Sequence, residues 1–200
     1  EFVMNVQEKF ESTSMAIGLY VHVPFCSSTC DFCAFYQEKP RKNSIKSYLS
    51  GLRLEFMRVS PPRPADTVFV GGGTPGVLSA AQLAELCGIV RKAGGEGILE
   101  WSVELAPSEV TEEKLQVLKS CGVTRISLGV QTFDPVLLAE LERNHPPDKA
   151  LRAYDLIRSV GFPSVNIDLI FGAPGQTLDA WERDIHRLVE LQPDHISTYC

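Results

Sequence analysis

The stretch Leu19-Tyr-Val-His-Val-Pro-Phe-Cys-Ser-Ser-Thr-Cys-Asp-Phe-Cys33 decides how the rest of the chain is interpreted. Every second residue from Leu19 to Val23 is apolar, with Tyr20 and His22 between them, and this period of two predicts a strand. Three cysteines follow at once with the spacing C-x3-C-x2-C. In parallel α/β folds the chemistry lies at the carboxyl ends of the strands. The stretch therefore predicts a strand that leads into a functional cysteine loop.

Outward from this stretch, short apolar strands alternate with helices along the chain. Strands separated by helices pair in parallel through right-handed crossovers, so the predicted fold class is α/β. Ser79 and Thr111 are suitable caps for two of the helices. The predicted strands cover residues 19–23, 67–70, 101–105, 125–130, 165–170 and 195–199. The predicted helices cover residues 44–59, 80–92, 111–120, 135–141, 148–160 and 178–191.

Most of these strands carry polar residues at alternate positions, unlike strands that are buried on both faces. An unpaired buried polar group costs about 1–3 kcal/mol, so a dry interior on that side is not expected. We expect a curved sheet or partial barrel whose apolar face packs on helices and whose concave polar face holds a ligand. An open sheet with one solvated face is the alternative. The polar positions include His22, Glu100, Ser102, Glu104, Arg125, Ser127, Gln131, Asn166, Asp168, His195, Ser197 and Tyr199.

The composition is that of a globular protein, with 44% hydrophobic and 22% charged residues. A formal net charge of −6 argues against a general nucleic-acid binder. No apolar run approaches the roughly 20 residues that span a bilayer, and residues 1–14 lack the layout of a signal peptide. We expect a cytoplasmic protein with a loose leader at residues 1–14 and one domain at residues 15–200.

The cysteine spacing indicates a metal site, because thiols stay reduced in the cytoplasm. Cys26, Cys30 and Cys33 could bind three irons of a [4Fe–4S] cluster and leave the fourth iron open for a ligand. A zinc-stabilised binding domain with His22 as a fourth ligand is the alternative. His22 is a strand residue, however, with little freedom to fold back onto the loop.

Further sequence blocks occur in a defined order, one leading into the cysteine loop and the others after it. They are YVHVPFC (20–26), GGGTP (71–75), SVE (102–104), SLGVQ (127–131), LERNH (141–145) and NIDLIFG (166–172). Together with the cysteine loop they resemble the radical S-adenosylmethionine (SAM) family. Within it they resemble the branch of oxygen-independent coproporphyrinogen III oxidases and HemW-type haem chaperones. The resemblance covers about residues 18–200 of this sequence.

The resemblance implies a partial (β/α)6 barrel that ends after its sixth strand, with the C-terminal substrate or haem domain absent from this chain. It implies a [4Fe–4S] cluster on the three cysteines, with SAM bound at the open iron. A flavodoxin- or ferredoxin-type donor would supply one electron, and SAM would break into methionine and a 5′-deoxyadenosyl radical. A tetrapyrrole, with haem among the candidates, is the implied substrate or cargo.

The family's SAM contacts transfer to residues on the matching blocks. From the residues alone, the glycine run is an ordinary tight turn and Arg143 an ordinary surface residue. The resemblance implies instead that the glycine turn approaches the methionine end of SAM, where a side chain would clash. The implied SAM contacts are Tyr20, Phe32, Gly72, Gly73, Thr74, Glu104, Gln131, Arg143 and Asp168.

One position separates the members of this branch. The oxidases carry a further cysteine two residues after the third, where this sequence has Phe35. This difference favours a HemW-like haem chaperone over coproporphyrinogen oxidation. Without a C-terminal domain to close the cavity, we expect slow SAM cleavage without action on a tetrapyrrole. We also expect Ile196 and Thr198 to lie on an unprotected sheet edge.

The three scattered cysteines carry no predicted metal role. Cys87 and Cys121 fall in or beside helices and are expected to be small buried residues.

Overall fold

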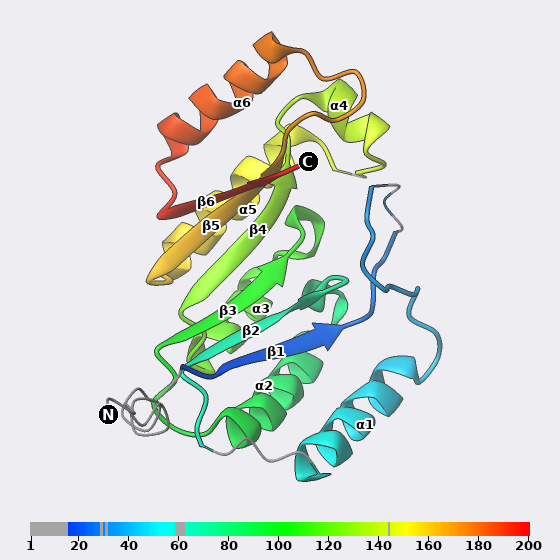
Figure 1. Ribbon diagram of the computed structural model, residues 1–200, viewed down its shortest axis with the longest axis vertical. Coiled ribbons are helices and arrows are strands. Elements are labelled where there is room, and N and C mark those ends of the chain that lie inside the picture. Colours follow the sequence, from blue (N-terminus) through cyan, green and yellow to red (C-terminus); the bar gives the residue numbers. More distant parts are fainter. Residues whose placement is uncertain (1–15, 29, 31, 59–62, 144) are drawn as a thin grey trace, which may run out of the picture.

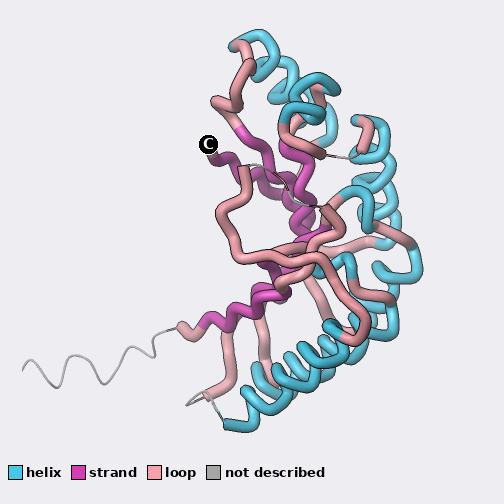
Figure 2. The backbone as a smooth tube through the Cα atoms, turned by 90° about the vertical axis from the view of Figure 1, so that its right-hand side faces the viewer, coloured by secondary structure: helices cyan, strands magenta, loops and turns pink. Residues whose placement is uncertain are grey.

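The computed structural model describes residues 16–28, 30, 32–58, 63–143 and 145–200. Its six strands form one parallel sheet in the order β1-β2-β3-β4-β5-β6, so each strand pairs with the next along the chain (Figure 1). The sheet is curved, and the helices lie along its convex side (Figure 2). This arrangement confirms the predicted α/β partial barrel. The predicted leader at residues 1–14 lies outside the described residues.

The elements begin and end close to the predicted positions. The strands are β1 (Gly18–Val23), β2 (Thr67–Gly72), β3 (Glu100–Leu105), β4 (Arg125–Gln131), β5 (Ser164–Ile170) and β6 (His195–Tyr199). The helices are α1 (Ser44–Arg58), α2 (Ala80–Gly94), α3 (Glu112–Ser120), α4 (Pro135–Glu140), α5 (Pro147–Val160) and α6 (Leu178–Leu191). Across the described ranges, none of these helices combines the length and the hydropathy needed to cross a membrane.

Local sequence signals explain several of these boundaries. The Ser79 side chain caps α2 in a capping box with Gln82, and Thr111 caps α3, as predicted. Strand β2 runs two residues further than predicted, because its glycines continue the pairing with β1 as far as the Val23–Gly72 pair. This extension brings the glycine run alongside the start of the cysteine loop.

The core lies between the sheet and the helices and is made by the apolar faces of the strands. Leu128 and Ile167 are fully buried there, and Trp101 is 1% exposed. Cys87 belongs to this core and Cys121 packs against it, which confirms their expected place as buried or partly buried residues. Burial, followed by the neighbouring Cys121, raises the pKa of the Cys87 thiol.

The polar faces of the central strands meet on the concave side, as the alternation predicts. The side chains of Ser102, Ser127 and Asn166 are buried although they are polar. They are paired rather than left without partners: the Asn166 amide donates to Ser127 Oγ at 2.7 Å. The concave side is therefore a hydrogen-bonded polar layer. On β6 the side chain of Ile196 is 44% exposed, in line with the expected exposure of this strand.

Candidate functional site

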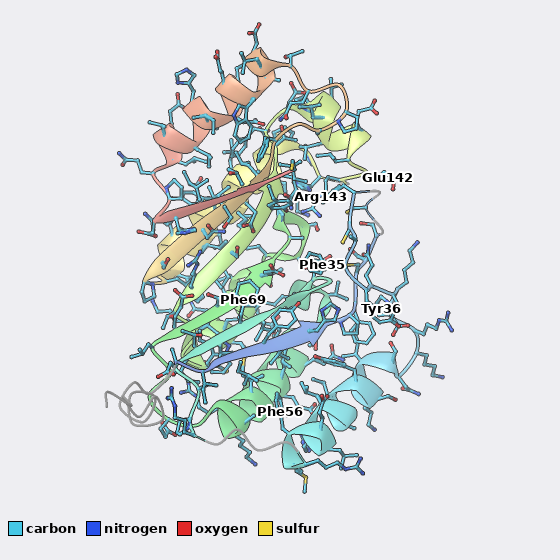
Figure 3. All side chains as sticks on the ribbon, viewed as in Figure 1. Phe35, Tyr36, Phe56, Phe69, Glu142 and Arg143 are labelled. Atoms are coloured by element: carbon cyan, nitrogen blue, oxygen red, sulfur yellow. The ribbon has the colours of Figure 1, made fainter. Side chains whose placement is uncertain are left out.

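Several predicted site residues lie on the strands, and Arg143 lies beyond the end of β4 (Figure 3). Five consecutive strands each carry one of them, and on β2 to β5 it lies at or towards the carboxyl end. These residues are Tyr20 on β1, Gly72 on β2, Glu104 on β3, Gln131 on β4 and Asp168 on β5.

The two arms of the cysteine loop are joined where the loop leaves β1. The backbone N–H of Glu38 donates to the carbonyl of Pro24 at 2.7 Å, and the N–H of Cys26 donates to the carbonyl of Glu38 at 3.1 Å. Within the loop, the N–H of Cys33 donates to the carbonyl of Cys30 at 3.0 Å. These bonds hold the three cysteines in a loop that is closed at its base.

The three thiols lie close enough to influence one another's ionisation. Burial, followed by the neighbouring Cys33 and Cys30, raises the pKa of the Cys26 thiol to about 11, and the nearby Arg143 opposes this shift. Cys30 is 9% exposed and the other two are half-buried. The Cys26 thiol is therefore protonated at neutral pH, so a metal bound there would have to displace its proton.

This donor set fits an iron–sulfur cluster better than a zinc ion. Among the residues that the structure describes, no three Cys, His, Asp or Glu side chains converge on one point that could hold a single metal ion. In a [4Fe–4S] cluster each cysteine binds a different iron, so such convergence is not required. The fourth ligand proposed for zinc, His22, already has other partners.

His22 links the first strand to the far arm of the cysteine loop. Its Nε2 lies 2.9 Å from the carbonyl oxygen of Tyr36, and its Nδ1 lies 3.0 Å from the hydroxyl of Tyr20. Because a carbonyl only accepts, Nε2 carries the proton and Nδ1 accepts from Tyr20. His22 thus reaches Tyr36, beyond the third cysteine, but among the described residues it does not converge with the cysteines on a single metal position. Tyr20 also stacks on Phe69, with ring centroids 6.1 Å apart.

The glycine run packs against β1 and the base of the cysteine loop. The N–H of Gly73 donates to the carbonyl of Val23 at 2.8 Å, and a Cβ on Gly73 would lie 2.6 Å from the carbonyl oxygen of Phe25. Gly72 has φ +112°, and a Cβ there would lie 2.5 Å from the His22 ring. Close packing within the protein therefore already requires glycine at both positions.

Two half-buried carboxyl groups, those of Glu104 and Asp168, lie on β3 and β5. The N–H of Gly72 donates to Glu104 Oε2 at 3.1 Å, while Asp168 accepts from Ser127 Oγ at 2.8 Å and from the Asn166 amide at 2.7 Å. Burial raises the pKa of Glu104 to about 7; the Gly72 hydrogen bond lowers it, and Asp168 raises it further. Burial also raises the pKa of Asp168. A cationic ligand would favour the charged form of both groups.

Arg143 connects the end of β4 to the cysteine loop. Its Nη2 donates to the carbonyl of Gly129 at 2.6 Å, and its Nη1 lies 3.6 Å from Cys30 Sγ (Figure 3). A Cβ on Gly129 would approach the guanidinium to 3.3 Å, so the glycine leaves room for it. The view of Arg143 as an ordinary surface residue, taken from the sequence alone, is therefore wrong.

Tyr199 also belongs to this region, although no site role was predicted for it from the sequence. Its hydroxyl donates to Gln131 Oε1 at 2.6 Å, and Gln131 has the positive φ of 73°. Burial, followed by the nearby Asp168, raises the pKa of Tyr199 to about 12, and Glu104 and Arg143 also act on it. The sequence contained a signal for such a role, because Tyr199 occupies a polar-face position at the carboxyl end of β6.

Several buried polar atoms near this region lack a hydrogen-bond partner within the described part of the chain. They are Thr74 Oγ1, Arg143 Nε and His145 Nε2. Buried polar atoms in native proteins are nearly always paired, so a bound ligand or water is expected to supply the missing partners. Phe32, by contrast, lies on the cysteine loop with 36% of its side chain exposed.

Comparison with known proteins gives consistent matches over almost the whole chain. The family model described as the radical SAM superfamily matches residues 20–188. The haem chaperone HemW of Bacillus subtilis is 35% identical over 90% of this chain and 49% of its own length. The oxygen-independent coproporphyrinogen III oxidase of Paracoccus denitrificans is 34% identical over 92% of this chain and 42% of its own.

A solved structure supports the same relationship. Coproporphyrinogen III oxidase (HemN) from Escherichia coli superimposes with a TM-score of 0.82 at 32% identity, over 92% of this chain and 44% of that one. The chain thus spans about half the length of the curated relatives it matches.

Proposed function

The chain belongs to the radical SAM superfamily, and we propose that Cys26, Cys30 and Cys33 bind a [4Fe–4S] cluster beside a SAM site at the carboxyl ends of the strands. The observation that supports the proposal is the contact of Arg143 with both Cys30 and the end of β4, which brings the cysteine loop close to the carboxyl end of that strand. When bound, the cluster and SAM supply the one-electron reductive cleavage of SAM with which radical chemistry starts.

The chain's own residues hold and shield these groups. Glu104 and Asp168 stabilise the positive charge of SAM and accept hydrogen bonds from it. Arg143 balances the negative charge of the thiolates. The glycine turn lets the backbone approach the ligand closely, and Tyr20 and Phe32 exclude water from it.

We further propose a HemW-like role in haem metabolism, with haem or a related tetrapyrrole as cargo. The similarity to HemW proteins and the presence of Phe35 in place of a fourth loop cysteine support this choice. The similarity to the HemN structure favours the alternative, oxidative decarboxylation of a porphyrinogen.

Anaerobic reconstitution tests the cluster proposal. We expect about four irons and four sulfides per chain and a paramagnetic signal on reduction that changes when SAM is added. Replacing Cys26, Cys30 or Cys33 by serine should each abolish the signal, whereas Cys87→Ser should not. A product with one zinc and no sulfide would overturn the proposal.

A second experiment separates the two roles in haem metabolism. The reconstituted chain is incubated anaerobically with dithionite, SAM and coproporphyrinogen III, and haem binding is titrated separately by absorbance. Saturable haem binding is the result expected of a chaperone, whereas absence of porphyrinogen turnover is expected of this chain in either role. Stoichiometric protoporphyrinogen would establish the oxidase alternative.

A further inference from the structure

The segment that follows the cysteine loop carries four exposed cations. They are Lys39, Arg41, Lys42 and Lys46, and Glu38 is the one acidic residue between positions 36 and 46. The chain as a whole has a formal net charge of −6, so this local excess of positive charge is set against a negative background. The net charge of the whole chain therefore does not reveal this local cluster of positive charge.

The basic segment begins directly beside a proposed cluster ligand. Glu38 is paired through its backbone with both Pro24 and Cys26, and Lys39 is the next residue. From there the chain runs along the outside of the sheet to the start of α1 (Figure 1). An anionic partner that contacts this segment would therefore lie next to the cysteine loop.

These cations are not explained by the stability of the fold. In the described parts of the chain, none of the four takes part in an ion pair. Lys42 lies just before α1 and Lys46 lies in its first turn, which contains no acidic residue. Positive charge at a helix N-terminus is unfavourable, because it opposes the helix dipole. Their placement costs stability and produces a positive field beside the site.

Two aromatic side chains are exposed on the same loop. Phe35 is 65% exposed and Tyr36 is 70% exposed, and both lie between the cysteines and the cations (Figure 3). Aromatic residues are enriched at the centres of protein interfaces, whereas charged residues occur at the rims. The combination is typical of a protein-docking surface.

We propose that this basic face, formed by Phe35, Tyr36, Lys39, Arg41, Lys42 and Lys46, docks a small acidic one-electron carrier protein of the flavodoxin type. The inference rests on the proposed function, because a SAM-cleaving cluster must receive an electron from outside the chain. The anionic flavin hydroquinone loses one electron and becomes the neutral semiquinone. The oxidised 2+ cluster gains that electron and becomes 1+, and no atom is transferred.

The physical properties of the face fit a transient complex of this kind. Redox complexes bury small interfaces, below about 1,200 Å², and complementary charge mainly accelerates their association. At about 0.15 M salt, charges interact over roughly 8 Å, so the docking should weaken as the salt concentration rises. A long polyanion would also meet the negative remainder of the chain, and this disfavours nucleic acid as the occupant.

Charge reversal on two faces of the chain tests the proposal. The double variant K42E/K46E reverses the basic face, and K92E/R152E makes the same change in charge at exposed residues of α2 and α5. The affinity of each reconstituted chain for a purified bacterial flavodoxin is measured by calorimetry at low and high salt. We expect K42E/K46E to weaken binding at least tenfold and the control variant to change it less than twofold.

A kinetic measurement separates docking from cluster chemistry. Stopped-flow bleaching of the cluster absorbance follows its reduction by flavodoxin hydroquinone or by dithionite. K42E/K46E should slow reduction by flavodoxin at least tenfold and leave reduction by dithionite unchanged. The variant should fold at least as well as the parent, because glutamate at the start of α1 favours the helix dipole.

The failures of the two proposals can be distinguished. If no cluster assembles in the parent chain, the proposed function fails. If the cluster assembles and binds SAM, then absent flavodoxin binding, or equal losses in both variants, overturns the docking proposal alone. Binding of phosphatidylglycerol vesicles through Lys42 and Lys46, without flavodoxin binding, would likewise overturn it in favour of a membrane surface.

Discussion

At the scale of single residues, the candidate site combines groups whose charged forms are disfavoured by burial. The Cys26 thiol and the Glu104 carboxyl both have raised pKa values, and burial is the largest cause in each case. Arg143 is the cation placed between the thiols and the strand ends. Iron bound to the thiols would favour the thiolate form, and a positively charged ligand beside the carboxyl groups would favour the carboxylate form.

Glu104 should make the chain, measured without added cofactors, less stable as the pH rises. Its folded pKa of about 7 lies above the usual value of 4.5, so the folded state holds the proton more tightly. The resulting stability is present below pH 4.5 and is lost as the pH rises through about 7, with an upper bound of about 3 kcal/mol. Urea unfolding between pH 5 and 8 should show a weaker pH dependence in Glu104→Gln than in the parent. Identical profiles would contradict the assignment.

Replacing Arg143 should change the chemistry of a cysteine that is distant in sequence. Arg143 lowers the pKa of the Cys26 thiol, so Arg143→Met should raise it further, and Arg143→Lys should have a smaller effect because it keeps the charge. Peptide-resolved iodoacetamide labelling against pH measures the thiolate fraction of Cys26. An unchanged labelling rate in Arg143→Met would show that the guanidinium does not act on the cysteine loop in solution.

At the scale of elements, the site depends on how closely the cysteine loop and the glycine run pack at the end of β1. The two segments are joined by backbone hydrogen bonds, such as that from Thr74 to Phe25 at 2.7 Å. No side chain fits between them at Gly73. The geometry of the cysteine loop is therefore coupled to that of β2.

Adding one methyl group at this contact should be costly. Gly73→Ala places a Cβ within 3.0 Å of three backbone atoms of Phe25, and such a clash should destabilise the chain by about 2–4 kcal/mol. The matched control is Gly88→Ala in α2, where a Cβ meets open space and should stabilise the helix by about 0.5–1 kcal/mol. Denaturant unfolding measures both. Equal stability of the two variants would argue against the tight contact.

The elements themselves were predictable from sequence, but the contacts between distant loops were not. The alternation of apolar and polar residues in β3 to β5 predicted both the strands and their polar face. It did so because one side of the sheet is apolar and packs on helices. The contact of Arg143 with Cys30 joins residues 113 positions apart, and no local pattern encodes it. The partner of His22 depends on how the cysteine loop folds back, which spacing alone does not reveal.

At the scale of the whole molecule, the site is assembled from the ends of successive strands in an open sheet. Each strand pairs only with its sequence neighbours, and β1 and β6 form the two edges. Tyr199 on β6 reaches Gln131 on β4, so the region spans almost the full width of the sheet. A ligand bound across these ends would connect strands whose backbones pair only with their neighbours.

SAM should therefore stabilise the cluster-loaded chain as a whole. At a concentration one hundred times its Kd, a ligand that binds only the folded state adds about 2.7 kcal/mol, which raises the Tm of a chain of this size by about 5–10 °C. Calorimetric scanning with and without SAM measures the shift, and hydrogen exchange should localise the new protection to the carboxyl ends of β1 to β5. The Cys30→Ser chain, which lacks a cluster ligand, should show a much smaller shift. An equal shift in that variant, or protection at the amino ends of the strands, would place SAM elsewhere than at the cysteine loop.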